Sequence, residues 1–422
     1  MLTAKRNEQL TRVGRGTPMG ELLRRYWFPV AVASDLDLIP TKRVRLLGED
    51  LVLYRDGQGR LGLLEEACPH RRASLVYGVC EVEGLRCGYH GWLFDQEGRC
   101  LEQPGEPADS TFKHRVAATA YQAQEMGGLI WGYLGPRPAP LLPRYDVFVW
   151  DGMLRDIGQA MIPVNFLQIM ENAVDPHHVE WLHGRYFSYL KERWGVVNAR
   201  SFAKRHVRIG FDVFEHGIIK RRLLEGQSED ADDWKIGHPM VFPDMLRVGG
   251  SGYYQAQIRV PVDDTHTWHV WYNAFKPGGV EVPAQETIPA YEVPFLDEKG
   301  NHIVDYVDGQ DIMAWVTQGA IADRTKEHLG KSDLGVIMLR RLFLQQIARV
   351  ERGQDPLGVV RDAEQNRVIV LPQEKDKFGA GEDFATEFIE TGSVRYSPQK
   401  DAIRALYQRA TAQNARVGAP GA

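Results

Sequence analysis

The sequence predicts an α+β fold in which a small all-β domain precedes a larger domain of antiparallel sheet and helices. Three observations lead to this prediction. Short strands separated by turn residues occupy residues 28–135, a proline-rich stretch (PRPAPLLPR) follows, and helical and strand periodicities are mixed beyond it. We therefore expect a helical segment at 1–27, the all-β domain at 28–135, a linker at 136–145 and the larger domain at 146–422.

The first elements are predicted from local signals. Thr17 is placed to cap a short helix that starts at Pro18, because proline suits the first helical position. The segment LVLYRDGQGRLGLLE then predicts a hairpin, since Asp56-Gly57 and Gln58-Gly59 separate two apolar runs.

The larger domain mixes two periodicities. FLQIMENAVDPHHVEWLH has helical spacing at Phe166, Met170 and Val174, whereas HTWHVWYNAF alternates as a half-buried strand does. Nearer the end, SDLGVIMLRRLFLQQIARVERG predicts an amphipathic helix that is capped by Ser332 and stops at Gly353.

Composition excludes several classes of function. The 422 residues are 43% hydrophobic and 25% charged, which is ordinary for a globular protein with a buried core. A net charge of −5 does not indicate a basic surface for nucleic acid. The sequence also contains no run of about 18 apolar residues, the length that a membrane-spanning helix needs. The N-terminal segment lacks the apolar stretch of a secretory signal, so we expect a cytoplasmic protein without a nucleic-acid or membrane partner.

All four cysteines lie between Cys68 and Cys100, and such a cluster in a long chain favours metal binding over disulfides. Two half-sites are present, Cys68-Pro-His70-Arg and Cys87-Gly-Tyr-His90-Gly-Trp. Two thiolates and two imidazoles suit a [2Fe–2S] cluster in which sulfur binds one iron and nitrogen the other. Structural zinc is the rival, but it usually takes paired cysteines and paired histidines. The spacing therefore predicts an iron–sulfur site.

A second constellation, NAVDPHHVEWLH, combines a carboxylate with several imidazoles. Two histidines and one carboxylate with open positions form the facial triad that suits Fe²⁺ and dioxygen. A carboxylate three residues before a ligating histidine can also accept its second N–H and fix its orientation. A histidine-rich helix alone is more often structural, but the iron–sulfur motif upstream favours a metal here.

Together the two motifs resemble those of the α-subunits of Rieske ring-hydroxylating oxygenases, whose iron motif runs D-x-x-H-x-x-x-x-H. The resemblance implies that Cys68 and Cys87 hold one iron of the [2Fe–2S] cluster and that His70 and His90 hold the other.

The same resemblance assigns His178 and His183 to a mononuclear Fe²⁺. Asp175 then matches the catalytic carboxylate that bridges a Rieske histidine to an iron histidine, and His177 keeps a structural role. An ideal helix turns about 500° over five residues, so it cannot aim both histidines at one metal. A break or bulge near Trp181 is therefore required.

The third iron ligand is less clear from the residues, because Asp305, Asp308, Asp311 and Asp323 are all candidates. GQDIMAWVTQG resembles the family's Gln/Glu-Asp pattern, and this resemblance selects Asp311 over Asp323.

Further segments, GELLRRYWFPVA, GHPMVFPDMLRVGG, RVPVDDTHTWHVWY and GAIADRTKEHLGKSD, look like the phthalate dioxygenase, 3-chlorobenzoate dioxygenase and phenoxybenzoate dioxygenase branch. This resemblance implies a Rieske β-domain joined to a helix-grip catalytic domain, in an α-only homotrimer. It also implies an NAD(P)H-dependent reductase of the flavin and ferredoxin type. Electrons would cross a subunit interface, where Asp175 links its own His178 to the partner subunit's His90. The expected reaction is hydroxylation or dihydroxylation of an aromatic, carboxylated substrate by dioxygen, in the catabolism of aromatic compounds.

Two alternatives stay open. The same ligand set serves monooxygenation or oxidative O-demethylation, so the motifs do not separate these reactions. A Rieske electron carrier is the alternative from another class, but a carrier needs neither a second metal site nor a second domain.

An arylcarboxylate substrate should meet a buried arginine, because the guanidinium binds carboxylates well. Arg208, Arg222, Arg247 and Arg259 lie on expected strands of the larger domain. We predict that Arg222, Arg247 and Arg259 line the substrate pocket.

Overall fold

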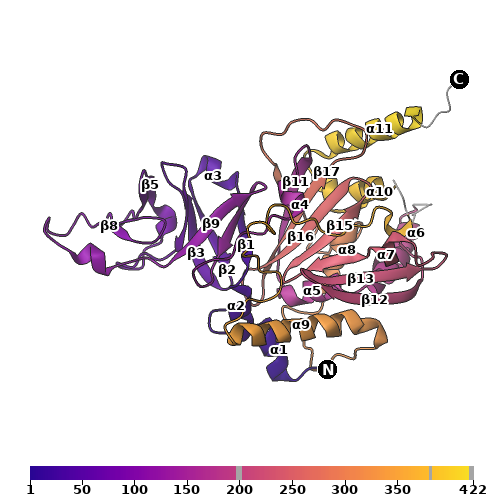
Figure 1. Cartoon of the computed structure of the whole chain (residues 1–422), viewed down its shortest axis with the longest axis horizontal. Helices are drawn as coiled ribbons and strands as arrows, with labels where there is room; N and C mark the ends of the chain where they lie inside the picture. The colour runs from indigo at the N-terminus through magenta and orange to yellow at the C-terminus, as the bar shows by residue number, and fades with distance from the viewer. Residues whose placement is uncertain (196–201, 380–382, 418–422) are drawn as a thin grey trace. The chain divides into compact units, whose positions relative to one another are not determined.

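The computed structural model describes residues 1–195, 202–379 and 383–417 (Figure 1). The chain divides into two compact units. The smaller unit consists of Arg12–Pro143 and Val359–Asn366, and the larger unit consists of Met1–Thr11, Arg144–Gly358 and Arg367–Ala422.

A six-stranded antiparallel sheet forms the body of the smaller unit, in the order β1-β10-β9-β4-β3-β2. Its strands are β1 (Trp27–Val32), β2 (Thr41–Leu46), β3 (Glu49–Arg55), β4 (Leu61–Glu65), β9 (Ala120–Met126) and β10 (Leu129–Tyr133). The paired strands β1 and β10 are buried along their whole length, so part of the core of this unit lies along that edge of the sheet.

The predicted hairpin joins β3 to β4. The side chain of Asp56 accepts hydrogen bonds from the backbone N–H groups of Gln58 and Arg60, each at 2.9 Å. Gly59 adopts a φ of +80°, which glycine tolerates without strain. These contacts close the turn that the sequence predicts.

A second, four-stranded sheet consists of β5 (Val79–Glu81), β6 (Gly84–Arg86), β7 (Leu93–Phe94) and β8 (Cys100–Glu102). It carries the Cys87–His90 loop between β6 and β7, whereas the Cys68–His70 loop follows β4 of the first sheet. The short helices of the unit are α2 (Pro18–Leu23), α3 (Asp35–Leu38), η1 (Leu75–Tyr77) and η2 (Phe112–Arg115). The predicted cap of α2 is confirmed, because the Thr17 hydroxyl accepts the Gly20 N–H at 3.1 Å.

The larger unit is built on an eight-stranded sheet in the order β12-β13-β14-β15-β16-β17-β11-β18. Its strands are β11 (Leu154–Ile162), β12 (His206–Phe214), β13 (Gly217–Leu224), β14 (His238–Val241), β15 (Met245–Gly250), β16 (Tyr253–Pro261), β17 (Thr267–Phe275) and β18 (Ala290–Glu292). All neighbours are antiparallel except β11 and β18.

Helices accompany this sheet (Figure 1). They are α1 (Ala4–Thr11), α4 (Asp146–Val149), α5 (Phe166–Ala173), η3 (Val179–Tyr186), α6 (Phe187–Arg193), α7 (Asp232–Lys235), α8 (Val307–Val316), η4 (Lys331–Asp333), α9 (Leu334–Glu351), η5 (Lys377–Gly379), α10 (Asp383–Thr391), η6 (Ser393–Tyr396) and α11 (Lys400–Val417). Among these helices α1, α5 and α9 contact one another. The predicted α+β class, with a β-sheet domain and a sheet-and-helix domain, is confirmed.

The predicted amphipathic helix is α9, but its start differs from the prediction. Ser332 lies inside the 3₁₀ turn η4, and the side chain of Asp333 accepts the backbone N–H of Gly330 at 2.7 Å. Capping by Ser332 was therefore wrong, because one extra turn precedes the α-helix. Within the described ranges, none of the helices combines the length and apolar character that a membrane-spanning segment requires.

Candidate metal centres

The histidine-rich segment follows α5 and is not a regular helix. His178 is the residue before η3, which is a π-helix. Hydrogen bonds between residues five apart widen each turn, so side chains with that spacing come toward one face. The rings of His178 and His183 accordingly lie with their centroids 5.2 Å apart. The irregularity predicted near Trp181 is confirmed, and it extends over the whole of η3.

Asp311 completes a triad with these histidines. Its Oδ1 lies 3.1 Å from His183 Nε2 and 3.8 Å from His178 Nε2. One donor atom from each of the three residues lies within 4.8 Å of the other two. Two imidazoles and one carboxylate at this spacing match the donor set of a facial triad.

The other candidate carboxylates have different surroundings. Asp308 is buried and accepts hydrogen bonds from Trp271 Nε1 and the Ser393 N–H, each at 2.7 Å. Asp305 pairs with Arg395, and Asp323 is exposed beside Thr325 and Lys326. Of the four candidates, only Asp311 joins the histidines.

Charge interactions within the triad oppose the effect of burial. Burial disfavours both charged forms, yet the attraction between the two groups prevails. The pKa of His183 is raised and the pKa of Asp311 is lowered. The site therefore favours a cation between the imidazoles and the carboxylate, and a metal ion is such a cation.

Neighbouring side chains contact the triad. His183 Nδ1 lies 2.9 Å from Gln310 Oε1, and Asn172 Nδ2 lies 3.5 Å from Asp311 Oδ1. Asp175 Oδ2 lies 3.6 Å from His178 Nδ1, and Asp175 Oδ1 accepts the backbone N–H of His177 at 2.8 Å. Burial alone would raise the pKa of Asp175, but hydrogen bonding and the charge of His178 outweigh it. The pKa of Asp175 is therefore lowered to about 2.

A cavity opens beside the triad, and all three triad residues lie in its wall. Its apolar lining is Val179, Phe202, Leu246, Val248, Val307, Phe378 and Phe388. Its remaining polar lining is Asn172, Lys220, Arg222, His238, Gln257, Asp308 and Lys377. A cavity that combines apolar and polar side chains beside such a triad is typical of a small-molecule site.

The three predicted arginines are all buried on strands but differ in position. Arg222 on β13 lines the cavity and donates from Nη2 to His238 Nδ1 at 3.0 Å. Its Nε and Nη1 have no hydrogen-bond partner in the described part of the chain. Arg247 on β15 lies 3.4 Å from Asp146, and Arg259 on β16 donates to Gln257 at 2.7 Å. Neither is among the described residues that line the cavity.

The cysteine–histidine motif of the smaller unit also forms one site. Cys68 and Cys87 are buried, whereas His70 and His90 are partly exposed, with ring centroids 4.5 Å apart. Within the described residues His70 Nδ1 is buried without a hydrogen-bond partner, and burial raises the pKa of Cys68 to about 11. Iron ions would satisfy the nitrogen and hold the sulfur as thiolate, so the residues fit the cluster.

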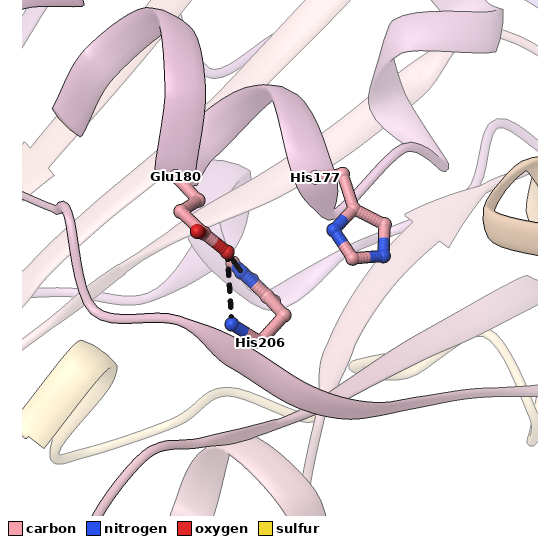
Figure 2. A group of neighbouring side chains, drawn as sticks. All are labelled: His177, Glu180 and His206. Carbon is pink, nitrogen blue, oxygen red and sulfur yellow. Dashed lines mark hydrogen bonds and ion pairs between the residues drawn. The ribbon is translucent and has the colours of Figure 1, made fainter. Parts of the chain in front are cut away.

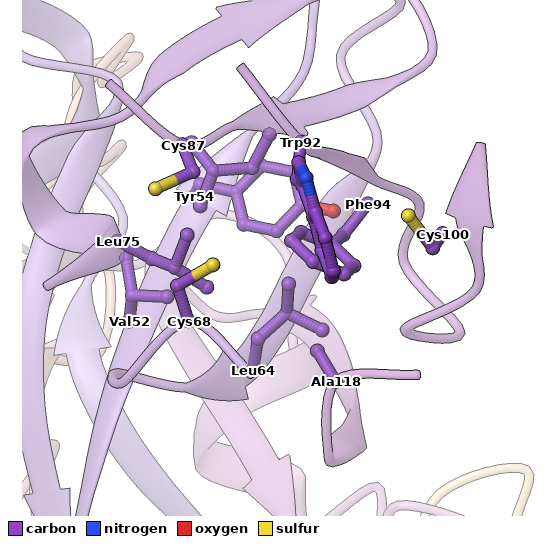
Figure 3. Close-up of a cluster of buried hydrophobic side chains, with 11 residues drawn as sticks. Val52, Tyr54, Leu64, Cys68, Leu75, Cys87, Trp92, Phe94, Cys100 and Ala118 are labelled. Carbon is purple, nitrogen blue, oxygen red and sulfur yellow. The ribbon is translucent and has the colours of Figure 1, made fainter. Parts of the chain in front are cut away.

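Figure 3 draws the buried side chains around this motif. The sulfur atoms of Cys68 and Cys87 lie at one edge of the cluster, and Cys100 lies on the other side. Trp92 stacks on His70 at 4.3 Å between centroids. None of the four cysteines, all of them described, forms a disulfide.

A third group contains His177, Glu180 and His206 (Figure 2). Glu180 Oε2 accepts the backbone N–H of His206 at 2.9 Å and lies 3.4 Å from its Nδ1. The other oxygen of Glu180 lies 3.4 Å from Arg185. Since both carboxylate oxygens are engaged, these contacts join η3 to the start of β12, and we assign the group a structural role.

Comparison with known proteins gives the family. The model of the Rieske [2Fe-2S] domain matches residues 26–118, and a model described as LigXa C-terminal domain like matches residues 298–374. The chain is 42% identical to the 5,5'-dehydrodivanillate O-demethylase oxygenase subunit of Sphingobium sp. (strain NBRC 103272 / SYK-6), over 88% of this chain and 87% of that protein. The chain belongs to the Rieske-type oxygenase α-subunits.

Other Rieske oxygenases support the same membership. Identity to the phthalate 4,5-dioxygenase oxygenase subunit of Pseudomonas putida is 34%, over 87% of this chain and 91% of that one. The solved terminal oxygenase of carbazole 1,9a-dioxygenase from Novosphingobium sp. KA1 has the same fold, with a TM-score of 0.56 and 19% identity, over 81% and 98% of the two chains. The protein is thus an oxidoreductase with a [2Fe–2S] cluster and a non-haem iron. Rieske oxygenases work with reductase or ferredoxin partners.

Sequence reasoning missed several residues of the cavity. Lys220, His238, Gln257 and Lys377 line it, yet they come from β13, β14, β16 and η5. No local spacing connects them, so only strand order could have placed them together. Lys220 is buried, and burial lowers its pKa well below the ordinary value.

Proposed function

We propose that this Rieske oxygenase acts on an aromatic acid whose carboxylate contacts Arg222. The main support is the guanidinium of Arg222, which is fully buried in the wall of the cavity. Two of its nitrogens lack hydrogen-bond partners in the described structure. A buried cation of this kind is costly unless an anion compensates it. The names of the dehydrodivanillate and phthalate enzymes support an acidic aromatic substrate. Arg247 and Arg259 are not among the described residues that line the cavity, so the proposal rests on Arg222.

We assign the metal ligands as the sequence motifs predict them. Cys68, His70, Cys87 and His90 hold the cluster, and His178, His183 and Asp311 hold the mononuclear iron. When bound, the cluster supplies electrons singly and the iron activates dioxygen. The protein contributes orientation: the cavity beside the triad holds the ring, Arg222 fixes the acid end, and the apolar wall excludes water.

Two reactions fit this arrangement, and each uses one dioxygen, two electrons and two protons. Dihydroxylation places both oxygen atoms on the ring and leaves a cis-diol. O-demethylation oxidises the methyl group of an aryl methyl ether to formaldehyde, leaves a phenol, and releases the second oxygen as water. Ring hydroxylation is the first proposal, and O-demethylation is the alternative. The alternative is supported by the 42% identity to an O-demethylase subunit.

The proposal includes a homotrimer in which Asp175 passes electrons between subunits. Asp175 lies beside His178 and is about 30% exposed, so one side of it is open to a neighbouring chain. An NAD(P)H-dependent reductase of the flavin and ferredoxin type is the proposed donor, which fits a cytoplasmic location.

A product assay with a donor reductase tests the substrate proposal. The panel contains benzoic acids with and without a methoxy group, and each acid is paired with its methyl ester. We expect turnover of the acids over the esters, with either formaldehyde and a phenol or a cis-diol as products. Preference for the neutral ester in every pair would overturn the aromatic-acid proposal but leave the oxygenase family untouched.

A further inference from the structure

We propose that Gln310 is a positioning residue that holds the proton of His183 on Nδ1 and leaves Nε2 free for iron. The inference rests on the proposed ligand set and concerns a residue outside it. Gln310 is fully buried on α8 and directly precedes Asp311. It therefore acts through His183 rather than on the metal.

The orientation of the Gln310 amide is fixed by its second contact. Nε2 of Gln310 lies 2.9 Å from the carbonyl oxygen of Val304, which can only accept a hydrogen bond. The NH₂ group must therefore face Val304, and Oε1 must face His183 Nδ1 at 2.9 Å. An amide oxygen can only accept, so Nδ1 of His183 carries the hydrogen.

The consequence is a histidine held on both sides by consecutive residues of one helix. Gln310 contacts Nδ1, and Asp311 lies 3.1 Å from Nε2. In a neutral imidazole with its proton on Nδ1, the lone pair of Nε2 points toward Asp311 and the metal position. A partner that orients a metal-binding histidine in this way typically changes metal affinity by about 10- to 100-fold.

Two substitutions separate this role from a purely structural one. Gln310→Glu keeps an acceptor for Nδ1 but loses the donor to Val304. Gln310→Met keeps the length of the side chain and loses both bonds. If Gln310 fixes the tautomer, the Glu variant binds Fe²⁺ nearly as wild type does and the Met variant binds it about 10- to 100-fold more weakly. If Gln310 only anchors the backbone through Val304, the Glu variant is the weaker of the two or both are equal.

The measurement is Fe²⁺ binding by chelator competition on the holo-cluster protein, with iron content and the cluster spectrum as checks. Gln318→Met is the matched control, because Gln318 is exposed just beyond the same helix and should bind iron as wild type does. His178→Ala is the reference for loss of the site. Wild-type affinity in Gln310→Met, with loss in His178→Ala, overturns the proposal alone. Wild-type affinity in both overturns the ligand assignment and the proposal with it. Neither result depends on the identity of the substrate.

Discussion

The two metal sites proposed for this chain are built in opposite ways. The proposed cluster site takes all four donors from two loops between Cys68 and His90, with buried sulfurs and partly exposed imidazoles. The proposed mononuclear site takes His178 from the position just before the π-helix η3, His183 from within it, and the third donor from α8, far along the chain. A site made of local loops can be recognised from spacing alone, whereas one that depends on tertiary packing can be recognised only in part.

The largest expected effect is loss of the cluster. Cys68→Ala removes a buried thiolate ligand, so the purified protein should lose its red-brown colour and its turnover completely. Cys80→Ala is the matched control, because the Cys80 thiol is not a proposed ligand. Its sulfur lies 3.5 Å from the carbonyl oxygen of Pro40. Visible absorption and iron content report both outcomes. A colourless wild-type protein with stoichiometric zinc would contradict the cluster assignment.

Loss of the mononuclear iron alone is expected from Asp311→Ala. This change removes the carboxylate that faces both histidines, while the cluster should keep its spectrum. Asp323→Ala is the control, because Asp323 is exposed and bonded to Thr325. Iron quantification should give two irons per chain in Asp311→Ala and three in Asp323→Ala. The reverse pattern would show that the third ligand is misassigned.

Asp175→Asn should separate the two sites without removing either. The amide keeps the size of the side chain but loses the charge beside His178, so both metals stay and electron transfer between subunits fails. Turnover should therefore be lost while metal content and cluster spectrum stay unchanged. Single-turnover reduction of the cluster, followed by product analysis, measures the defect. Normal turnover in this variant, or full activity of an isolated monomer, would sink the bridging role.

The smallest expected effect concerns substrate alone. Arg222→Met leaves a substrate carboxylate unpaired in the cavity, which costs about 2–4 kcal/mol, or roughly 30- to 1,000-fold in kcat/KM for an aromatic acid. The matching ester should be hardly affected, and both metals should remain. Arg208→Met is the control, because Arg208 is half exposed, pairs with Glu229 and lies outside the described lining of the cavity. Equal losses for acid and ester would indicate a packing defect instead.

The sequence predicts the local features of the molecule well. The Cys68 and Cys87 loops, the Asp56 hairpin and the Thr17 cap each depend on residues close in the chain, and the structure contains all three. The irregular helix also follows from spacing, because a five-residue separation of two ligands requires it.

The remainder depends on packing between distant segments. Residue types alone left four aspartates open, and only the fold brings Asp311 to His183. The strands that carry Arg222, Arg247 and Arg259 were predicted, but strand periodicity does not say which side chains meet a cavity. Nearly every residue of β15 and β17 is buried, so the half-buried strand predicted from HTWHVWYNAF was wrong, and its alternation does not tell which face meets the cavity.

The π-helix η3 also constrains how this protein can change over evolutionary time. Between His178 and His183, a substitution at Trp181 can be tolerated, because its side chain is 61% accessible. A change in the number of residues is different, since deleting one position would rotate His183 by about a quarter of a turn. We therefore expect lineages of this enzyme to vary exposed positions of the segment such as Trp181 and to keep its length constant.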